Sequence, residues 1–267
     1  MVHASDGDAG SDADLSLDAL TADYAVFQRR KGHRFSSDDI VTAWAAMQVC
    51  PDPSEVLDLG CGLGSVLLHL AWSAPHARLV GVEAQAQSFA LLERNVAHNG
   101  LGHRVRVRHG DLRDRNVIDA LGGPFDLVTG TPPYFPVDTA TDAMDGQRAF
   151  ARIEYRGGIE DYVFTAASLL APDGWFVVCG DADAQGRVDS SAANEQLALC
   201  AQWIVLPRAG RPPLFTVWAL RHDSAATPLQ QRILTLRDVA GERTDDAKVL
   251  RAFSGFPERA SAAPRLS

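Results

Sequence analysis

From residue 55 onward, short apolar runs alternate along the chain with longer amphipathic runs. Short apolar runs are typical of buried strands, whereas apolar residues spaced three or four apart are typical of helices. Strands are expected at 55–59, 78–83, 104–109, 125–129, 175–179, 203–206 and 214–220, and helices at 65–72, 85–99, 116–121, 160–170 and 194–200. This alternation predicts right-handed βαβ units, and therefore a mostly parallel sheet covered by helices on both faces.

Two connections depart from this alternation. The turn-like segment RAGRPP (208–213) joins the last two strands without a helix, so these strands are expected to pair antiparallel. Residues 136–158 form a connection of about 23 residues with weak periodicity, and loops of that length are usually functional or disordered. The predicted fold class is therefore α/β, with a seven-stranded, mostly parallel sheet whose last strand is antiparallel.

Composition restricts the class of protein further. The chain has 267 residues, of which 46% are hydrophobic, enough for one large domain with a substantial core. No apolar run approaches the roughly 18 residues of a membrane helix, and the first residues lack the features of a secretory signal. A protein without membrane contact, in the cytoplasm, is expected. The acidic segment 1–20 is expected to be a disordered tail.

Cysteine spacing and charge also exclude some functions. The four cysteines lie far apart without CxxC spacing, which argues against a zinc site, and no metal is expected. The net charge is −9, but five of these charges come from aspartates in the first 18 residues, leaving −4 for the remainder. That balance argues against extensive wrapping of nucleic acid, although it permits a local basic patch.

A glycine-rich turn follows the first strand of the series. VLDLGCGLG (56–64) places Gly60, Gly62 and Gly64 between a strand and a helix, with Asp58 two residues ahead. Glycines at such a turn let the backbone approach a ligand closely, and a helix N-terminus favours polar or negative groups. The GxGxG spacing differs from the GxGxxG of dinucleotide sites.

Two acidic residues follow at the ends of the next strands. Glu83 ends the second strand, where a carboxylate can accept both hydroxyls of a ribose, although a solvated strand end is the alternative. Asp111 and Leu112 follow the third strand, where a carboxylate beside an apolar residue suits an adenine. Taken alone, Asp111 would be interpreted as a turn residue.

Together with the segment FDLVTGTPPY, these motifs resemble the S-adenosylmethionine-dependent methyltransferases of the Rossmann-like, seven-stranded class. More narrowly, the chain resembles the bacterial tRNA(Val) adenine-N6 methyltransferase family. The resemblance runs in family order across roughly residues 28–255, and its matching stretches are KGHRFSSDD (31–39), VLDLGCGLGSVLLHLA (56–71), GVEAQAQSFALLERNVAHNGL (81–101), GDLRD (110–114), DLVTGTPPYFP (126–136), YRGGIEDYVFTAASLLAPDG (155–174) and ILTLRDVAGE (233–242). The first and last stretches narrow the family, because the others are common to many methyltransferases.

The resemblance implies a set of cofactor-binding residues and a domain organisation. It implies that Asp58 and the three glycines cradle the methionine end of S-adenosylmethionine, that Glu83 holds the ribose, and that Asp111 and Leu112 hold the adenine. The implied organisation is a single methyltransferase domain over 21–255, with an N-terminal lid segment at 23–47, a C-terminal extension at 223–255 and a tail at 256–267. Candidate lid residues are Arg34, Phe35 and Asp38; the alternative is that Ser36 or Ser37 caps a helix there.

The segment Thr131-Pro132-Pro133-Tyr134 is the predicted catalytic motif. Related enzymes have Asn-Pro-Pro-Tyr, in which the Asn oxygen and a carbonyl of the proline region accept the two N–H groups of a planar amine. The tyrosine stacks on the target base, which must leave its stack. Here Thr131 replaces the asparagine; its hydroxyl is also an acceptor, but it is shorter and β-branched.

Three functions are consistent with these features. The first is methylation of the exocyclic N6 of an adenine in RNA, expected to be a tRNA, by a monomeric enzyme. The second is methylation of a protein amide or small-molecule nitrogen, and the third is a catalytically degenerate factor that binds cofactor and RNA. Two basic segments, QRRKGHR (28–34) and HRVRVRH (103–109), are candidate RNA contacts, together with Arg148, Arg152 and Arg156 in the long loop. Arginines at the edge strand 104–109 also discourage edge-to-edge pairing, the interpretation favoured for that segment.

Overall fold

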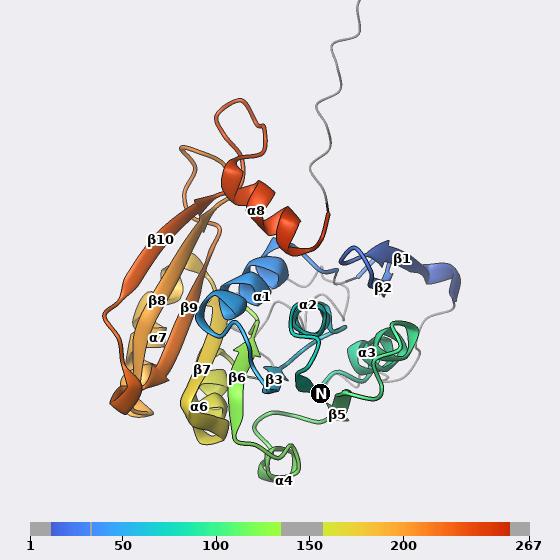
Figure 1. Ribbon diagram of the computed structural model, residues 1–267, viewed down its shortest axis with the longest axis horizontal. Helices are drawn as coiled ribbons and strands as arrows, with labels where there is room; N and C mark the ends of the chain where they lie inside the picture. The colour runs from blue at the N-terminus through green and yellow to red at the C-terminus, as the bar shows by residue number, and fades with distance from the viewer. Residues whose placement is uncertain (1–11, 33, 135–156, 257–267) are drawn as a thin grey trace, which may run out of the picture.

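A computed structural model describes residues 12–32, 34–134 and 157–256, and it contains an eight-stranded sheet in the order β10-β8-β9-β7-β6-β3-β4-β5 (Figure 1). The strand β9 pairs antiparallel with both β7 and β8, whereas every other neighbouring pair in this sheet is parallel. The strands of the sheet are β3 (Glu55–Leu59), β4 (Arg78–Glu83), β5 (Val105–His109), β6 (Phe125–Gly130), β7 (Leu170–Gly180), β8 (Leu197–Leu206), β9 (Phe215–His222) and β10 (Gln230–Thr235). The predicted α/β class and the antiparallel pairing of the last two expected strands are confirmed.

Helices cover both faces of the sheet, because its strands are apolar on both sides. One face carries α1 (Ser37–Val49), α2 (Ser65–Ser73) and α3 (Ala86–His98), and buries side chains such as Leu67, Leu92 and Val177. The other face carries α4 (Arg115–Asp119), α6 (Ile159–Leu169) and α7 (Gln185–Asn194), and buries Phe125, Phe176 and Trp218. The carboxyl ends of β3, β4, β5 and β6 therefore meet at one edge between the two helical layers.

The C-terminal half differs from the sequence prediction in two regions. The prediction of a helix at 194–200 is wrong. The helix α7 ends at Asn194, Gln196 adopts a positive φ of 55°, and β8 starts at Leu197. That left-handed residue reverses the chain, so Leu197 enters the core as a strand residue. The sheet also has an eighth strand, β10 in the C-terminal extension, whose pairing with β8 covers an edge that would otherwise remain open. The helix α8 (Asp245–Phe253) follows and packs on α1 and β10.

The acidic N-terminal segment is ordered in its second half. Residues 12–14 form a short 3-10 helix and β1 (Leu15–Ala19) pairs antiparallel with β2 (Ala25–Arg29), so the expected disorder is wrong for residues 12–19. The segment contains Leu15, which is buried, and that apolar anchor explains why its charges do not keep it unfolded. Residues 1–11, the 257–267 part of the expected tail and most of the long loop, 135–156, lie outside the described residues.

The hairpin β1–β2 is attached to α3 by two asparagines. The Asn95 side chain accepts from the Phe27 N–H at 2.7 Å and donates to the Phe27 carbonyl at 3.1 Å, and Asn99 does the same with Ala25 at 3.0 and 2.8 Å. Asn95 also donates to the carbonyl of Leu63 in the glycine turn, at 2.9 Å. These bonds satisfy the open edge of β2 and connect the N-terminal hairpin to the turn that follows β3.

Candidate cofactor and substrate site

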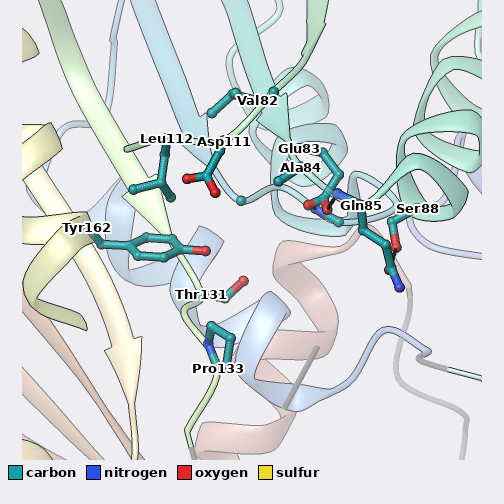
Figure 2. A pocket seen from close by; sticks show the side chains of 13 residues that line it. Val82, Glu83, Ala84, Gln85, Ser88, Asp111, Leu112, Thr131, Pro133 and Tyr162 are labelled. Atoms are coloured by element: carbon teal, nitrogen blue, oxygen red, sulfur yellow. Dashed lines mark hydrogen bonds between the residues drawn. The ribbon is translucent and has the colours of Figure 1, made fainter. Parts of the chain in front are cut away.

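A cavity opens at the carboxyl ends of β3, β4, β5 and β6, where the sequence placed the glycine turn and the acidic residues. Its lining joins residues from five separate segments of the chain: Gly60, Gly62, Val82, Glu83, Ala84, Gln85, Ser88, Gly110, Asp111, Leu112, Thr131, Pro133 and Tyr162 (Figure 2). Ligands of open α/β sheets bind outside the carboxyl ends of the strands, and this cavity lies in that position.

The glycine turn forms the floor of the cavity near β3. Gly60 and Gly62 have φ angles of 60° and 56°, in the left-handed region that glycine adopts without strain. A Cβ added to Gly62 would meet no atom within 4 Å, so the backbone there is open to a ligand. Gly64 has a different role: it precedes α2, and a Cβ there would lie 2.7 Å from Leu92. Its φ of 95° and its contact with Leu92 favour glycine at this helix start, and Gly64 does not line the cavity.

Glu83 is held in one orientation at the end of β4. Its Oε2 accepts from the Gly62 N–H at 2.9 Å and its Oε1 accepts from the Gln85 N–H at 2.6 Å, and the side chain is almost buried. A carboxylate fixed in this way beside the glycine turn can accept two hydroxyls of a bound sugar.

Asp111 and Leu112 lie at the opposite wall, after β5. The Asp111 carboxylate forms a bidentate pair with Arg113, whose Nε and Nη2 donate to its Oδ1 and Oδ2 at 2.9 and 2.7 Å. Arg113 was not identified from the sequence; its pairing orients Asp111, and the pair raises the pKa of Arg113. Leu112 is buried, with its carbonyl accepting from the Thr165 hydroxyl at 3.0 Å, which leaves an apolar wall beside the carboxylate.

Asp58 lies behind the glycine turn and does not line the cavity. Its side chain is 1% exposed, and its Oδ1 accepts from the Thr129 hydroxyl at 2.8 Å, whereas its Oδ2 is buried without a partner among the described residues. Burial raises the pKa of Asp58 to about 7. Nearby, burial and the neighbouring Asp38 raise the pKa of Asp39 to about 8. A cation bound nearby would favour the ionised, negatively charged form of these two carboxyls.

The predicted catalytic segment leaves β6 at the same edge. β3 pairs parallel with β6 so that Leu59 lies opposite Gly130, and the next residues, Gly60 and Thr131, continue side by side into the cavity. Thr131 and Pro133 line the cavity, whereas Pro132 is buried beneath it. The hydroxyl of Thr131 has no hydrogen-bond partner among the described residues, and Figure 2 shows it directed into the cavity.

Tyr134 and the candidate lid residues Arg34, Phe35 and Asp38 do not line the cavity. The Tyr134 hydroxyl donates to Asp38 Oδ2 at 2.9 Å and contacts the Cys179 thiol, and burial raises its pKa well above the usual value. Arg34 pairs with Asp18 of β1 at 3.0 Å. Stacking of Tyr134 on a base, as predicted, would require the ring to leave its contacts with α1 and β7. Ser36 precedes α1 and donates its N–H to Asp39 at 2.8 Å, as the capping alternative predicts.

Tyr162 of α6 is a lining residue that the sequence reasoning missed. It lies on the buried face of its helix with Ile159, Val163 and Ala166, so the periodicity alone marks it as a core residue. A signal was nevertheless present, because the hydroxyl of a buried tyrosine needs a polar environment. Gln85 and Ser88 at the start of α3 were missed as well; the Ser88 hydroxyl donates to Gln85 at 2.6 Å.

These residues fit S-adenosylmethionine, which carries an adenine, a ribose and a cationic methionine end. The open Cβ position of Gly62 allows the ligand to approach the backbone closely. The buried, unpartnered Oδ2 of Asp58 suits the positive charge of the ligand. The anchored carboxylate of Glu83 suits the hydroxyls of the sugar. In the described part of the chain, no group of three or more His, Cys, Asp or Glu residues could hold a metal ion. No helix in the described ranges is long and apolar enough to cross a membrane.

Comparisons with known proteins agree with this geometry. A family model described as a methyltransferase domain matches residues 56–153. A solved structure described as a predicted O-methyltransferase from Agrobacterium tumefaciens superposes with a TM-score of 0.62 and 16% identity, covering 84% of this chain and 99% of that one. At that identity the likeness concerns the fold alone. The fold, the cavity and these matches make the chain similar to S-adenosylmethionine-dependent methyltransferases of the Rossmann-like class.

Within that class the chain is similar to enzymes with two kinds of acceptor. A tRNA1(Val) (adenine(37)-N6)-methyltransferase from Porphyromonas gingivalis is 31% identical over 144 residues, which cover 53% of this chain and 56% of the relative. A release factor glutamine methyltransferase from Chlorobaculum tepidum is 32% identical over 144 residues, covering 52% of this chain and 48% of the relative. The chain thus spans about half the length of these relatives.

Proposed function

We propose that this protein transfers a methyl group from S-adenosylmethionine to the exocyclic N6 of an adenine in RNA, namely a cytoplasmic tRNA. The observation that carries the proposal is the position of Thr131-Pro132-Pro133, which leaves β6 beside the glycine turn at the wall of the cavity. A planar nitrogen placed against this segment would lie in the same cavity as the glycine turn and Glu83, the residues that would hold the cofactor.

The chemistry explains why such a segment is needed. When bound, the cofactor supplies an electrophilic methyl group on a sulfonium. The lone pair of an adenine amino group is delocalised into the ring, so the amine becomes a nucleophile only when its N–H groups are held by acceptors. Thr131 can accept one N–H, and the two prolines that follow it supply no competing N–H.

The bond changes in the proposed transfer balance without any further reactant except water. The nitrogen lone pair forms the new N–C bond while the S–C bond breaks, and its electron pair stays on sulfur. The nitrogen then carries one proton too many, and that proton leaves to water. The residues of this chain orient the amine and hold the neighbouring charges, and no covalent intermediate with the protein is formed.

Features outside the catalytic fold support RNA as the substrate. The stretches 31–39 and 233–242, which resemble the tRNA methyltransferase family, lie in the N-terminal segment and the C-terminal extension, outside the part that is common to many methyltransferases. Arg30 and Lys31 are exposed at the end of the β1–β2 hairpin, where they are accessible to phosphates. Arg106 and Arg108 are also exposed, but β5 is the edge of the sheet, and discouraging edge-to-edge pairing remains sufficient to explain them.

The similarity to release factor glutamine methyltransferases supports a second candidate, methylation of a protein amide, because an amide nitrogen is planar like the adenine N6. The two candidates are separated by incubating the purified protein with methyl-labelled cofactor and either bulk tRNA or release factor. Digestion of the RNA followed by mass spectrometry should identify N6-methyladenosine. Label that enters only protein, or that survives nuclease treatment, would contradict the RNA proposal. Cofactor binding without transfer to either acceptor would instead indicate the degenerate factor.

A further inference from the structure

Tyr162 occupies space that only glycine leaves open on two neighbouring strands. A Cβ added to Gly60 would lie 2.0 Å from the Tyr162 hydroxyl oxygen, and a Cβ added to Gly130 would lie 2.6 Å from Cδ1 of the same ring. The ring therefore lies flat against the ends of β3 and β6. Glycine at both positions is what allows a tyrosine from α6 to reach this edge of the sheet.

This placement brings the Tyr162 hydroxyl to the level of Thr131. The pairing of Leu59 with Gly130 puts Gly60 beside Thr131, and the hydroxyl lies at Gly60. Figure 2 shows both hydroxyls directed into the same space, with Asp111 and Leu112 on one side and Glu83 on the other. Neither hydroxyl has a hydrogen-bond partner among the described residues, although the Tyr162 side chain is 5% exposed.

The surroundings keep this hydroxyl protonated. Burial, followed by the negative charge of Glu83, raises the pKa of Tyr162 well above its usual value. A protonated phenol can accept one hydrogen bond and donate another. It cannot act as a general base near neutral pH, so its contribution to the reaction is to position a group.

We propose that the Tyr162 hydroxyl accepts an N–H of the substrate's amino group and, together with Thr131, forms the pair of acceptors that directs the nitrogen lone pair. This inference rests on the proposed function. Threonine reaches less far than asparagine, and Tyr162 of α6 supplies a second hydroxyl oxygen in the same cavity.

The test compares Tyr162→Phe with the wild type, using the full chain, labelled S-adenosylmethionine and bulk tRNA. The variant should lower the single-turnover rate of methyl transfer 10- to 100-fold, while the dissociation constant for S-adenosylmethionine changes less than threefold. Introducing Thr131→Asn into the Tyr162→Phe variant should recover part of the rate, because the longer side chain restores an acceptor. Tyr24→Phe is the matched control, since the Tyr24 hydroxyl lies in the hairpin region, 3.5 Å from Arg104.

The outcomes separate this inference from the function on which it rests. If the wild type makes N6-methyladenosine and Tyr162→Phe transfers at the same rate, the role of Tyr162 is wrong while the proposed function stands. A variant that loses only cofactor affinity also contradicts it, because the hydroxyl would then bind the cofactor. If the wild type transfers no methyl group to tRNA, both fail. A melting temperature for each variant shows whether a lost rate reflects lost folding.

Discussion

The backbone N–H of Gly62 donates a 2.9 Å hydrogen bond to Glu83, so the turn after β3 and the end of β4 are held together by the carboxylate expected to bind ribose. Glu83→Ala removes this bond and the bond from Gln85. Hydrogen bonds to a charged group contribute roughly 1.5–3 kcal/mol, so cofactor affinity should fall about 10- to 100-fold. Isothermal titration calorimetry measures this change. Glu55→Ala is the control, because Glu55 pairs with Arg78 at the opposite end of the same strands, and an equal loss there would contradict a local role.

Cofactor affinity should rise with pH through about 7. Burial raises the pKa of Asp58 to about 7, so the carboxyl gains its negative charge in this range, and that charge favours the cationic cofactor. Between pH 6 and 8 the ionised fraction rises about tenfold, which sets the largest gain in affinity that this residue can supply. The measurement is the dissociation constant of S-adenosylmethionine at several pH values. An Asp58→Asn variant that keeps the full pH dependence would exclude Asp58 as its origin.

The same shift predicts how the stability of the free protein depends on pH. The carboxyl of Asp58 has an ordinary pKa of 3.8 in the unfolded chain and about 7 in the folded chain. Between these values the folded state binds the proton more tightly, so the contribution of Asp58 to the free energy of unfolding decreases as pH rises from about 4 to about 7. Asp39, with a pKa of about 8, acts in the same direction. Asp58→Asn should flatten the fall in melting temperature between pH 5 and pH 8, and an unchanged slope would contradict this.

Asn95 should influence both stability and the cofactor site. Asn95→Ala breaks its bonds to Phe27 and Leu63, and at roughly 1 kcal/mol for each of three hydrogen bonds the loss in the free energy of unfolding should be about 3 kcal/mol. Denaturant unfolding measures this loss. Asn99→Ala is the matched comparison, because Asn99 bonds the hairpin in the same way but does not contact the glycine turn. Only Asn95→Ala should also weaken cofactor binding; equal effects on binding would contradict the connection through Leu63.

Tyr134 provides a test of whether its ring must move. The hydroxyl bond to Asp38 holds the ring away from the cavity, so Tyr134→Phe releases an aromatic that can still stack, whereas Tyr134→Ala removes it. Stacking on a base contributes roughly 1–3 kcal/mol, so Tyr134→Ala should slow transfer about 5- to 150-fold. Tyr134→Phe should retain the wild-type rate or exceed it. Single-turnover rates with tRNA decide this, and a rate for Tyr134→Ala equal to wild type would show that the ring does not stack.

The hydroxyl of Thr131 should matter for transfer and not for cofactor binding. Thr131→Val keeps the branched shape and removes the only polar atom that this side chain presents to the cavity. Loss of one positioned hydrogen bond to a reacting group should lower the transfer rate about 10- to 100-fold. Rapid-quench measurements with saturating cofactor give this rate, and calorimetry should show an unchanged dissociation constant. If Thr131→Asn alone raises the rate far above wild type, the native residue is a degenerate form of the motif.

The order of strands and helices, and part of the candidate site, could be predicted from local sequence. Alternation of apolar and amphipathic runs predicted the βαβ order, because burial on both faces leaves a periodic signal along each element. Gly60, Gly62, Glu83, Asp111 and Leu112 could be assigned to one site because parallel strands bring their carboxyl ends to one edge of a sheet. The strand from Leu197 was missed because a single left-handed residue, Gln196, separates it from α7, and that conformation is visible only in the fold.

The tertiary structure decided which of the candidate side chains face the cavity. Tyr134 directly follows the lining residue Pro133, yet its hydroxyl bonds to Asp38, which is distant in the chain and holds the ring away from the cavity. Arg34 belongs to the basic segment, yet its ion pair with Asp18 of β1 also holds it away from the cavity. Tyr162 reaches the cavity only because two glycines on different strands leave room for its ring. Sequence periodicity determines which residues are buried, but the direction of a side chain at a site depends on contacts between segments that the chain brings together only on folding.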